Sequence, residues 1–118
     1  MHVYDPTNIF ARILRGEIPN KTVMESAHTL AFHDINAAAP VHVLVIPKGP
    51  YVTLDHFLTA GSAEEIGDFH KTVAAICQGL GGGYRAITNA GAHGMQDVPH
   101  YHLHILAGRP LGRLVERE

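Results

Sequence analysis

The sequence lacks the features that define three classes of protein. A single cysteine, Cys77, excludes an intrachain disulfide scaffold and a cysteine-rich zinc site, and its apolar neighbours favour a structural role. No segment approaches the roughly 20 apolar residues of a membrane-spanning helix, and the longest apolar candidate, residues 43–46, has the length of a strand. The nine lysines and arginines are scattered without a basic run, which argues against general nucleic-acid binding. We therefore expect one soluble domain over residues 1–118.

Histidine, with ten residues, is unusually frequent among the titratable side chains. The formal net charge is −2 with neutral histidines, and protonation of all ten histidines would bring it to +8. At pH 7 the chain is therefore no general binder of polyanions, although a small phosphorylated ligand is compatible with this charge. Residues 1–5 show no basic segment followed by a long apolar stretch, so we expect a cytoplasmic location.

Apolar periodicity predicts two helices. Asp5-Pro6 suits the N-cap and first position of a short N-terminal helix that Gly16 ends. Ser62 and Glu65 have the spacing of a capping box. Apolar residues then recur at helical spacing up to the glycine-rich residues 79–83, which predicts that the main helix ends there.

Strand-like runs complete an α+β pattern. They cover residues 22–25, 29–34, 41–46 and 84–89, and an antiparallel meander is the simplest arrangement of the first three. The glycines near residue 80 follow a helix and precede a strand. A dinucleotide-binding loop needs the reverse order, so the sequence excludes a Rossmann fold.

A fifth strand-like run, residues 100–107, carries three histidines in strict alternation. As a strand it would place His100, His102 and His104 on one face. At about 3.3 Å per residue the outer pair would lie roughly 13 Å apart. Two of these imidazoles could bind one zinc ion, but the third could not easily converge on it. The polar loop at residues 89–99, just before this run, has backbone donors that could hold an anion beside the imidazoles.

Together these segments resemble the histidine triad superfamily, and in particular its Hint branch of nucleoside phosphoramidate hydrolases. The resemblance is carried by residues 10–19 (FARILRGEIP), 31–48 (AFHDINAAAPVHVLVIPK), 83–91 (GYRAITNAG) and 96–110 (QDVPHYHLHILAGRP). It implies an antiparallel five-stranded sheet with one main helix and a short N-terminal helix. It also implies a homodimer in which two sheets join into a ten-stranded one, with a nucleotide cleft on each protomer.

The resemblance also implies catalytic roles. His102 would be the nucleophile that attacks the α-phosphorus of a purine nucleoside 5′-phosphoramidate, expels the amine and forms a nucleotidyl-histidine that water cleaves. The main-chain carbonyl of His100 would fix which ring nitrogen of His102 is protonated. His104 would contact phosphate oxygens, and His42 would complete the histidine set. No cofactor is implied.

Further residues match nucleotide-binding positions of the family. Asp34 matches the carboxylate that accepts the ribose hydroxyls, while Asn89 and Gln96 match polar positions at the phosphate and ribose. The base pocket is matched by apolar and aromatic residues and one histidine: Phe10, Ile13, Phe32, His33, Ile35 and Leu44. A core role explains Phe10 and Ile13 equally well. The remaining histidines, His2, His28, His56 and His70, match no functional position, and we expect them on the surface.

The loop before the histidine run departs from the family pattern. Asp97 stands where the animal enzymes carry a serine that helps the leaving group, Met95 replaces a glycine, and His93 replaces an acidic residue. We expect the Asp97 carboxylate to turn to solvent and leave its backbone N–H at the phosphate. The alternatives are pairing with a protonated imidazole and proton donation to the leaving amine. We expect His93 to be exposed.

Two other functions remain compatible with the sequence. One is a purine-nucleotide-binding regulator that retains the cleft without turnover, and the other is a metal enzyme that uses His100 and His102. The sequence leaves open the amine and the choice between adenosine and guanosine.

Overall fold

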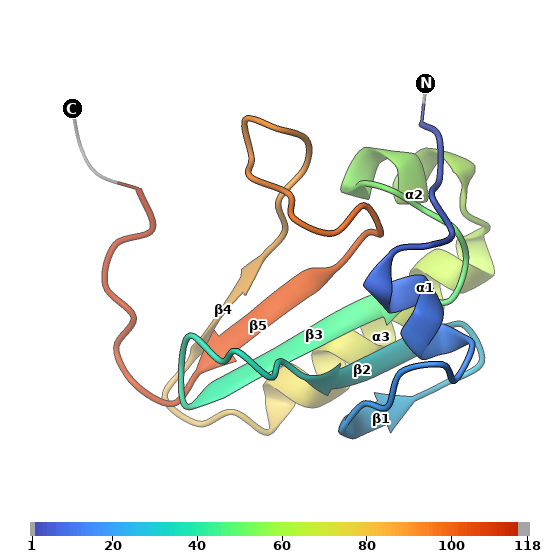
Figure 1. Cartoon of the computed structure of the whole chain (residues 1–118). Helices are drawn as coiled ribbons and strands as arrows, with labels where there is room; N and C mark the ends of the chain where they lie inside the picture. Colours follow the sequence, from blue (N-terminus) through green and yellow to red (C-terminus); the bar gives the residue numbers. More distant parts are fainter. Residues whose placement is uncertain (1, 116–118) are drawn as a thin grey trace.

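The computed structural model describes residues 2–115, which form an antiparallel sheet with three helices (Figure 1). The elements in chain order are α1 (Ile9–Leu14), β1 (Thr22–Glu25), β2 (Thr29–His33), β3 (Val41–Pro47), α2 (Leu54–Ala60), α3 (Ala63–Gln78), β4 (Tyr84–Ile87) and β5 (Leu103–Ala107). The strand order is β1-β2-β3-β5-β4, and all paired strands are antiparallel. The expected α+β fold with a five-stranded sheet is confirmed.

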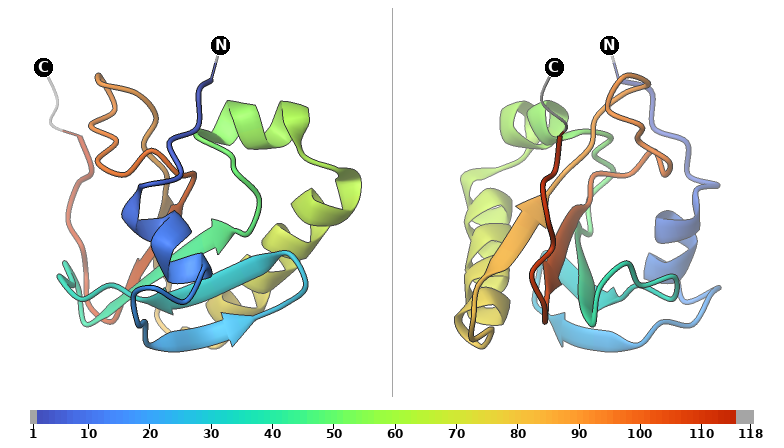
Figure 2. Two further views of the ribbon diagram at one scale, coloured as in Figure 1. Left: turned by 45° about the vertical axis from the view of Figure 1, so that its right-hand side comes forward. Right: turned by 90° about the vertical axis from the view of Figure 1, so that its left-hand side faces the viewer.

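The two faces of the sheet are covered differently. Figure 2 shows α3 across one face and α1 over the other. Val43 and Val45 of β3 belong to the core cluster that contains Phe69 of α3, whereas Leu44 and Ile46 pack in a second cluster on the α1 side. Because strand side chains alternate between faces, the even-numbered residues of β3 point towards α1. The α1 side therefore also receives His42.

The main helix begins and ends as the sequence predicts. The Ser62 hydroxyl accepts a hydrogen bond from the Glu65 backbone N–H, and the Glu65 carboxylate accepts one from the Ser62 N–H. These reciprocal bonds satisfy donors that have no partner within the helix. Gly79 follows the last helical residue. Cys77 is buried in the core, and burial raises the pKa of its thiol, as suits a structural cysteine.

The N-terminal helix starts later than expected. Asp5-Pro6 is not its cap, because the Asp5 carboxylate accepts bonds from the N–H and hydroxyl of Thr7 and thereby closes a turn. The cap is Asn8, whose side chain accepts from the Ala11 N–H at 2.9 Å. Both are favoured capping residues, so the local pattern alone did not decide between them.

The histidine run is only partly a strand. β5 begins at Leu103 instead of His100, because the Tyr101 N–H donates to the carbonyl of Tyr51 at 2.7 Å and so leaves the sheet ladder. Three other strand ends also differ from expectation: β2 ends at residue 33, β3 extends to residue 47, and β4 ends at residue 87. In the last case the Thr88 hydroxyl donates to the His102 carbonyl, which fixes the backbone where β4 stops.

No sequence pattern predicted α2 (Leu54–Ala60). Thr53 caps it with its side chain, and its one buried residue, Phe57, stacks against Tyr101 with ring centroids 5.3 Å apart. In the part of the chain that the structure describes, no helix is both long and apolar enough to cross a membrane.

Candidate active site

Four histidines gather where β3 and β5 run side by side beneath α1. His42 pairs with Leu106 and His104 pairs with Leu44 across the two strands, which brings the two imidazole centroids within 5.2 Å. The ring of His102, just before β5, lies 5.0 Å from that of His104. The tight geometry follows from neighbouring antiparallel strands that present side chains to the same face.

The His102 ring is fixed by the backbone of its own segment. Its Nδ1 lies 2.7 Å from the carbonyl oxygen of His100, and a carbonyl can only accept, so Nδ1 is the protonated nitrogen. In a neutral imidazole Nε2 then carries a free lone pair. Phe10 packs edge-on against the ring at 4.9 Å, and the residue is 3% exposed. The structure therefore presents one buried nitrogen, His102 Nε2, with a lone pair in a defined orientation.

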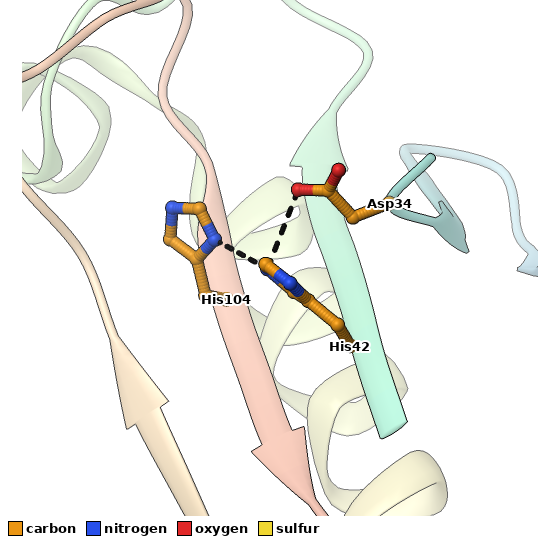
Figure 3. A group of neighbouring side chains, drawn as sticks. All are labelled: Asp34, His42 and His104. Carbon is orange, nitrogen blue, oxygen red and sulfur yellow. Dashed lines mark hydrogen bonds and ion pairs between the residues drawn. The ribbon is translucent and has the colours of Figure 1, made fainter. Parts of the chain in front are cut away.

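A chain of hydrogen bonds defines the proton positions on the next two imidazoles. The Ala38 N–H donates to His42 Nδ1 at 3.0 Å, so the neutral His42 ring carries its proton on Nε2. His42 Nε2 lies 2.9 Å from His104 Nδ1, which must then accept (Figure 3). The neutral His104 ring consequently has its proton on Nε2, turned away from His42. The Ala38 N–H thus determines, through the His42 ring, that His104 Nε2 is a hydrogen-bond donor.

Asp34 lies on the other side of His42. Its carboxylate is 3.4 Å from His42 Nε2 (Figure 3). The carboxylate also accepts a bond from the Asn36 N–H. Ligand atoms of Asp34, His42 and His104 lie within 4.8 Å of one another, a spacing that a metal ion could use. The tautomer opposes this use, because a metal at His42 Nε2 would displace the proton that the Ala38 N–H keeps on that atom. The group fits a hydrogen-bonded chain better than a metal site.

The electrostatics of the site favour the neutral form of His104, because its pKa is lowered. Burial lowers the pKa of His104, positive charge on His102 or His42 would lower it further, and the carboxylates of Asp34 and Asp97 oppose the shift. Protonation of His104 Nδ1 would set two N–H groups against each other at the contact with His42. Because the pKa of His104 is lowered, this disruption requires a more acidic pH than an ordinary histidine would need.

The His100 side chain is held beneath the site. Its ring is fully buried, with Nε2 2.8 Å from the Pro47 carbonyl and Nδ1 2.7 Å from the Tyr4 hydroxyl. Burial lowers the pKa of His100 to about 4, although the hydrogen bond to Pro47 opposes the shift. At neutral pH the ring is therefore uncharged. Of the three alternating histidines only His104 lies on β5, since His100 and His102 both precede the strand.

The loop before β5 is closed by Gln96. The side-chain oxygen of Gln96 accepts from the Gly91 N–H, and its amide nitrogen donates to the carbonyls of Val52 and Val98. Asn89, at the start of the same loop, is half-buried. The polar side-chain atoms of Gln96 thus stabilise the conformation of the loop beside His102.

Asp97 is placed differently from the expectation. Its carboxylate is 80% exposed, but it does not turn away from the site, because Oδ1 lies 3.5 Å from His102 Nε2. The same oxygen accepts from the Val98 N–H at 2.9 Å, which holds the carboxylate in place. Asp97 is therefore both open to solvent and adjacent to His102 Nε2.

Met95 occupies a strained backbone position in this loop. Its φ is 60°, in the left-handed region where glycine carries no penalty, and its side chain is 83% exposed. This fits the expectation that the family has a glycine there. His93 is exposed, as expected.

The expected base-pocket residues divide into two groups. Phe32 and Leu44 are buried in the core cluster around Phe10. Ile35 is 88% exposed, and His33 is also exposed, so these two are free to meet a ligand. Ile13 packs at the margin of the same core cluster.

Three of the four histidines expected on the surface, His2, His28 and His56, have side-chain or backbone partners. His2 stacks on His56 with ring centroids 4.6 Å apart and lies 3.3 Å from the carboxylate of Asp55. His56 accepts a hydrogen bond from the Val52 N–H and is half-buried, so it is not a freely solvated side chain. His28 faces the Glu64 carboxylate at 3.4 Å, and His70 is exposed.

Sequence reasoning missed two contributors to the site. The Ala38 amide is a backbone donor, so no residue type signals it. Tyr4 lies 96 positions from its partner His100, and no motif or periodicity marks it. Only the folded arrangement identifies either group.

Comparison with known proteins agrees with this geometry. The chain belongs to the HIT family, whose HIT domain model matches residues 15–111. A 13.2 kDa HIT-like protein of Azospirillum brasilense is 50% identical over 117 residues, covering 97% of this chain and 96% of the relative. A purine nucleoside phosphoramidase of Escherichia coli is 38% identical over 110 residues, covering 91% of this chain and 92% of the enzyme.

Solved structures give the same family. A HIT family hydrolase from Clostridium thermocellum has a TM-score of 0.83 and 34% identity, with 93% of this chain and 97% of that chain covered. A histidine triad protein from Clostridium difficile has a TM-score of 0.80 and 36% identity, with 96% and 100% covered. The fold is therefore that of a HIT protein.

Proposed function

We propose that this protein hydrolyses purine nucleoside 5′-phosphoramidates through a covalent intermediate on His102. The observation that carries the proposal is the bond from His102 Nδ1–H to the His100 carbonyl, which leaves the Nε2 lone pair available beside the donor His104. The similarity to the purine nucleoside phosphoramidase of Escherichia coli supports the substrate class. The proposal includes one HIT domain over residues 1–118 and a cytoplasmic location.

The reaction would proceed in two displacements. His102 Nε2 attacks the α-phosphorus, the phosphorus–nitrogen bond breaks, and the amine departs with a proton from solvent. Water then attacks the nucleotidyl-histidine, which releases the nucleoside monophosphate and restores the His102 lone pair. In both steps the proton on His104 Nε2 would bond a phosphoryl oxygen and stabilise the charge that develops there.

Residues around the histidines would hold the nucleotide. Asp34, 20% exposed at its side chain, would accept the ribose hydroxyls, since a carboxylate suits a vicinal diol. Ile35 and His33 would meet the base above the buried Phe32 and Leu44. Backbone donors of the loop from Asn89 to Asp97, shaped by Gln96, would surround the phosphate.

Mass spectrometry of the intact protein tests the proposal. Mixing the protein with an adenosine or guanosine 5′-phosphoramidate and quenching in cold base should reveal one added nucleotidyl group, and peptide mapping should place it on His102. A nucleoside monophosphate should accumulate in parallel. Nucleotide binding with neither adduct nor product would instead identify a nucleotide-binding regulator.

We also propose a homodimer in which two sheets join into one of ten strands. β4 is an edge strand, and exposed unpaired edges invite pairing with another chain. Tyr84, the first residue of β4, is 53% exposed although it is large and aromatic. Sedimentation equilibrium at micromolar concentration should give twice the 12.8 kDa chain mass. A fully active monomer would contradict this assembly.

Replacement of Asp97 by serine should have a small effect. Two unit charges about 6 Å apart interact by roughly 0.7 kcal/mol at a dielectric constant near 80, which corresponds to about threefold in binding. The strong exposure of the carboxylate justifies this solvent-like value. We expect Asp97→Ser to raise kcat/KM by less than about fivefold, with Glu64→Gln as the distant acidic control.

Two outcomes would contradict this account of Asp97. A gain of more than about tenfold would mean that the carboxylate opposes the substrate directly. A comparable loss, with a displaced acidic limb of the pH profile, would make Asp97 the proton donor for the leaving amine.

A further inference from the structure

The N-terminal arm, residues 2–8, contacts the buried His100 through the half-buried Tyr4. In Figures 1 and 2 this arm runs from α1 along the end of the sheet towards α2. The Tyr4 hydroxyl lies 2.7 Å from His100 Nδ1, and the two rings meet edge to face with centroids 5.5 Å apart. The contact joins the beginning of the chain to the segment that carries the nucleophile.

The direction of this hydrogen bond follows from the second nitrogen of His100. Nε2 lies 2.8 Å from the Pro47 carbonyl, which can only accept, so Nε2 carries the proton of the neutral ring. Nδ1 must therefore accept, and Tyr4 must donate. Since the His100 ring is fully buried, loss of the Tyr4 hydroxyl would remove the protein partner of Nδ1.

His100 passes this constraint to the nucleophile through its backbone. Its carbonyl oxygen accepts the Nδ1–H of His102 at 2.7 Å, so the orientation of the His100 residue determines where His102 Nε2 points. Phe10 packs edge-on against both rings, at 6.2 Å from His100 and 4.9 Å from His102. Phe10 contacts the His100 ring and the Pro47 carbonyl holds its Nε2, while the Tyr4 hydroxyl holds the second ring nitrogen, Nδ1.

The N-terminal arm is attached to the helices on both sides of Tyr4, at His2 and at Pro6. His2 stacks on His56 of α2 with an interplanar angle of 12° and pairs with Asp55. Arg15, at the end of α1, donates to the carbonyl of Pro6 at 2.8 Å. Both ends of the arm are thus attached to helices, and Tyr4 lies between the two attachments.

We propose that Tyr4 is a positioning residue for catalysis, which holds His100 so that the His100 carbonyl keeps His102 in its nucleophilic tautomer and orientation. The inference rests on the proposed use of His102 as the nucleophile. Small displacements of a reacting group cost catalysis far more than they cost binding. The Tyr4 hydroxyl should therefore affect kcat and leave KM nearly unchanged.

Tyr4→Phe is the direct test, because it removes one oxygen and keeps the aromatic ring. We expect kcat and the rate of nucleotidyl-His102 formation to fall about tenfold or more, with KM within about twofold. The matched control is Val3→Ala in the same arm, which alters an 81% exposed side chain and should leave both constants unchanged. Thermal unfolding of both variants gives the folded fraction at the assay temperature.

A second readout needs no substrate. Long-range ¹H–¹⁵N spectra of the imidazoles should show His102 protonated on Nδ1 in the wild type and a mixture of tautomers in Tyr4→Phe. Because this measurement is independent of turnover, it distinguishes failure of the inference from failure of the proposed function.

Two results would overturn the role of Tyr4. One is a folded Tyr4→Phe variant with wild-type kcat and an unchanged His102 tautomer. The other is a loss of activity that only follows the unfolded fraction and disappears on cooling, which would make Tyr4 a stabilising residue alone.

Discussion

Replacement of His102 by alanine should reduce kcat for a purine nucleoside phosphoramidate by at least about 10⁴-fold, because the variant lacks the atom that bonds to phosphorus. Binding of a purine nucleoside monophosphate should change less than about threefold, since the proposed ribose and base contacts belong to other residues. Steady-state kinetics and titration calorimetry measure the two quantities. Retained turnover would rule out His102 as the nucleophile.

The variant also removes a ring that is 3% exposed and packs on Phe10, so a second replacement is needed. His102→Gln keeps most of the volume and should be equally inactive. His70→Ala is the matched control, since His70 is an exposed histidine on α3 and its loss should leave kcat unchanged.

A chelator distinguishes the covalent mechanism from a metal-dependent one. The His42 tautomer, fixed by the Ala38 N–H, opposes a metal at the Asp34 group. Wild-type activity should therefore survive excess EDTA. Loss of activity in EDTA that is reversed by added zinc would support the hypothesis of a metal-dependent enzyme.

The fold could be predicted where a local pattern and its tertiary surroundings agree. The capping box at Ser62 and the apolar periodicity after it are both local, and α3 forms as they predict. The short helix α2 has seven residues and one buried side chain, Phe57, so its amphipathic signal is too weak to detect. The start of β5 depends on a hydrogen bond from Tyr101 to the distant Tyr51, which no local pattern encodes.

The site residues also divide into those that the sequence predicted correctly and those that depend on contacts it does not encode. The resemblance brought His42 and His104 into one set, and strand pairing places them in contact. The sequence predicts that Asp97 turns to solvent, with pairing to an imidazole and proton donation as the alternatives. Its own bond to the Val98 N–H instead keeps it beside His102. Backbone donors and long-range contacts, which have no side-chain signature, therefore account for what the sequence did not predict.

The second large effect is expected at His104. His104→Ala should lower kcat by about 10²- to 10³-fold, the usual result of removing one hydrogen-bond donor to a developing oxyanion. KM should change little, because the bond strengthens mainly as charge develops. His104→Gln, which retains an N–H donor, should recover part of the loss.

The role of His42 can be separated from that of His104. His42→Phe keeps an aromatic ring but removes the donor to His104 Nδ1, which frees His104 to take the other tautomer. We expect a smaller loss of kcat, about tenfold, and no further loss when His42→Phe is combined with His104→Ala. Additive losses would show that His42 acts independently of His104.

A sulfur-substituted substrate tests which atom His104 contacts. Sulfur accepts hydrogen bonds weakly, so an α-phosphorothioamidate should react slowly in the diastereomer whose sulfur replaces the oxygen bonded by His104 Nε2. The wild type should therefore discriminate between the two diastereomers, and His104→Ala should lose most of that discrimination. Because the pKa of His104 is lowered by burial, the wild-type preference should persist at pH values below the ordinary histidine pKa. Equal discrimination by the variant would place the phosphoryl contact on another donor.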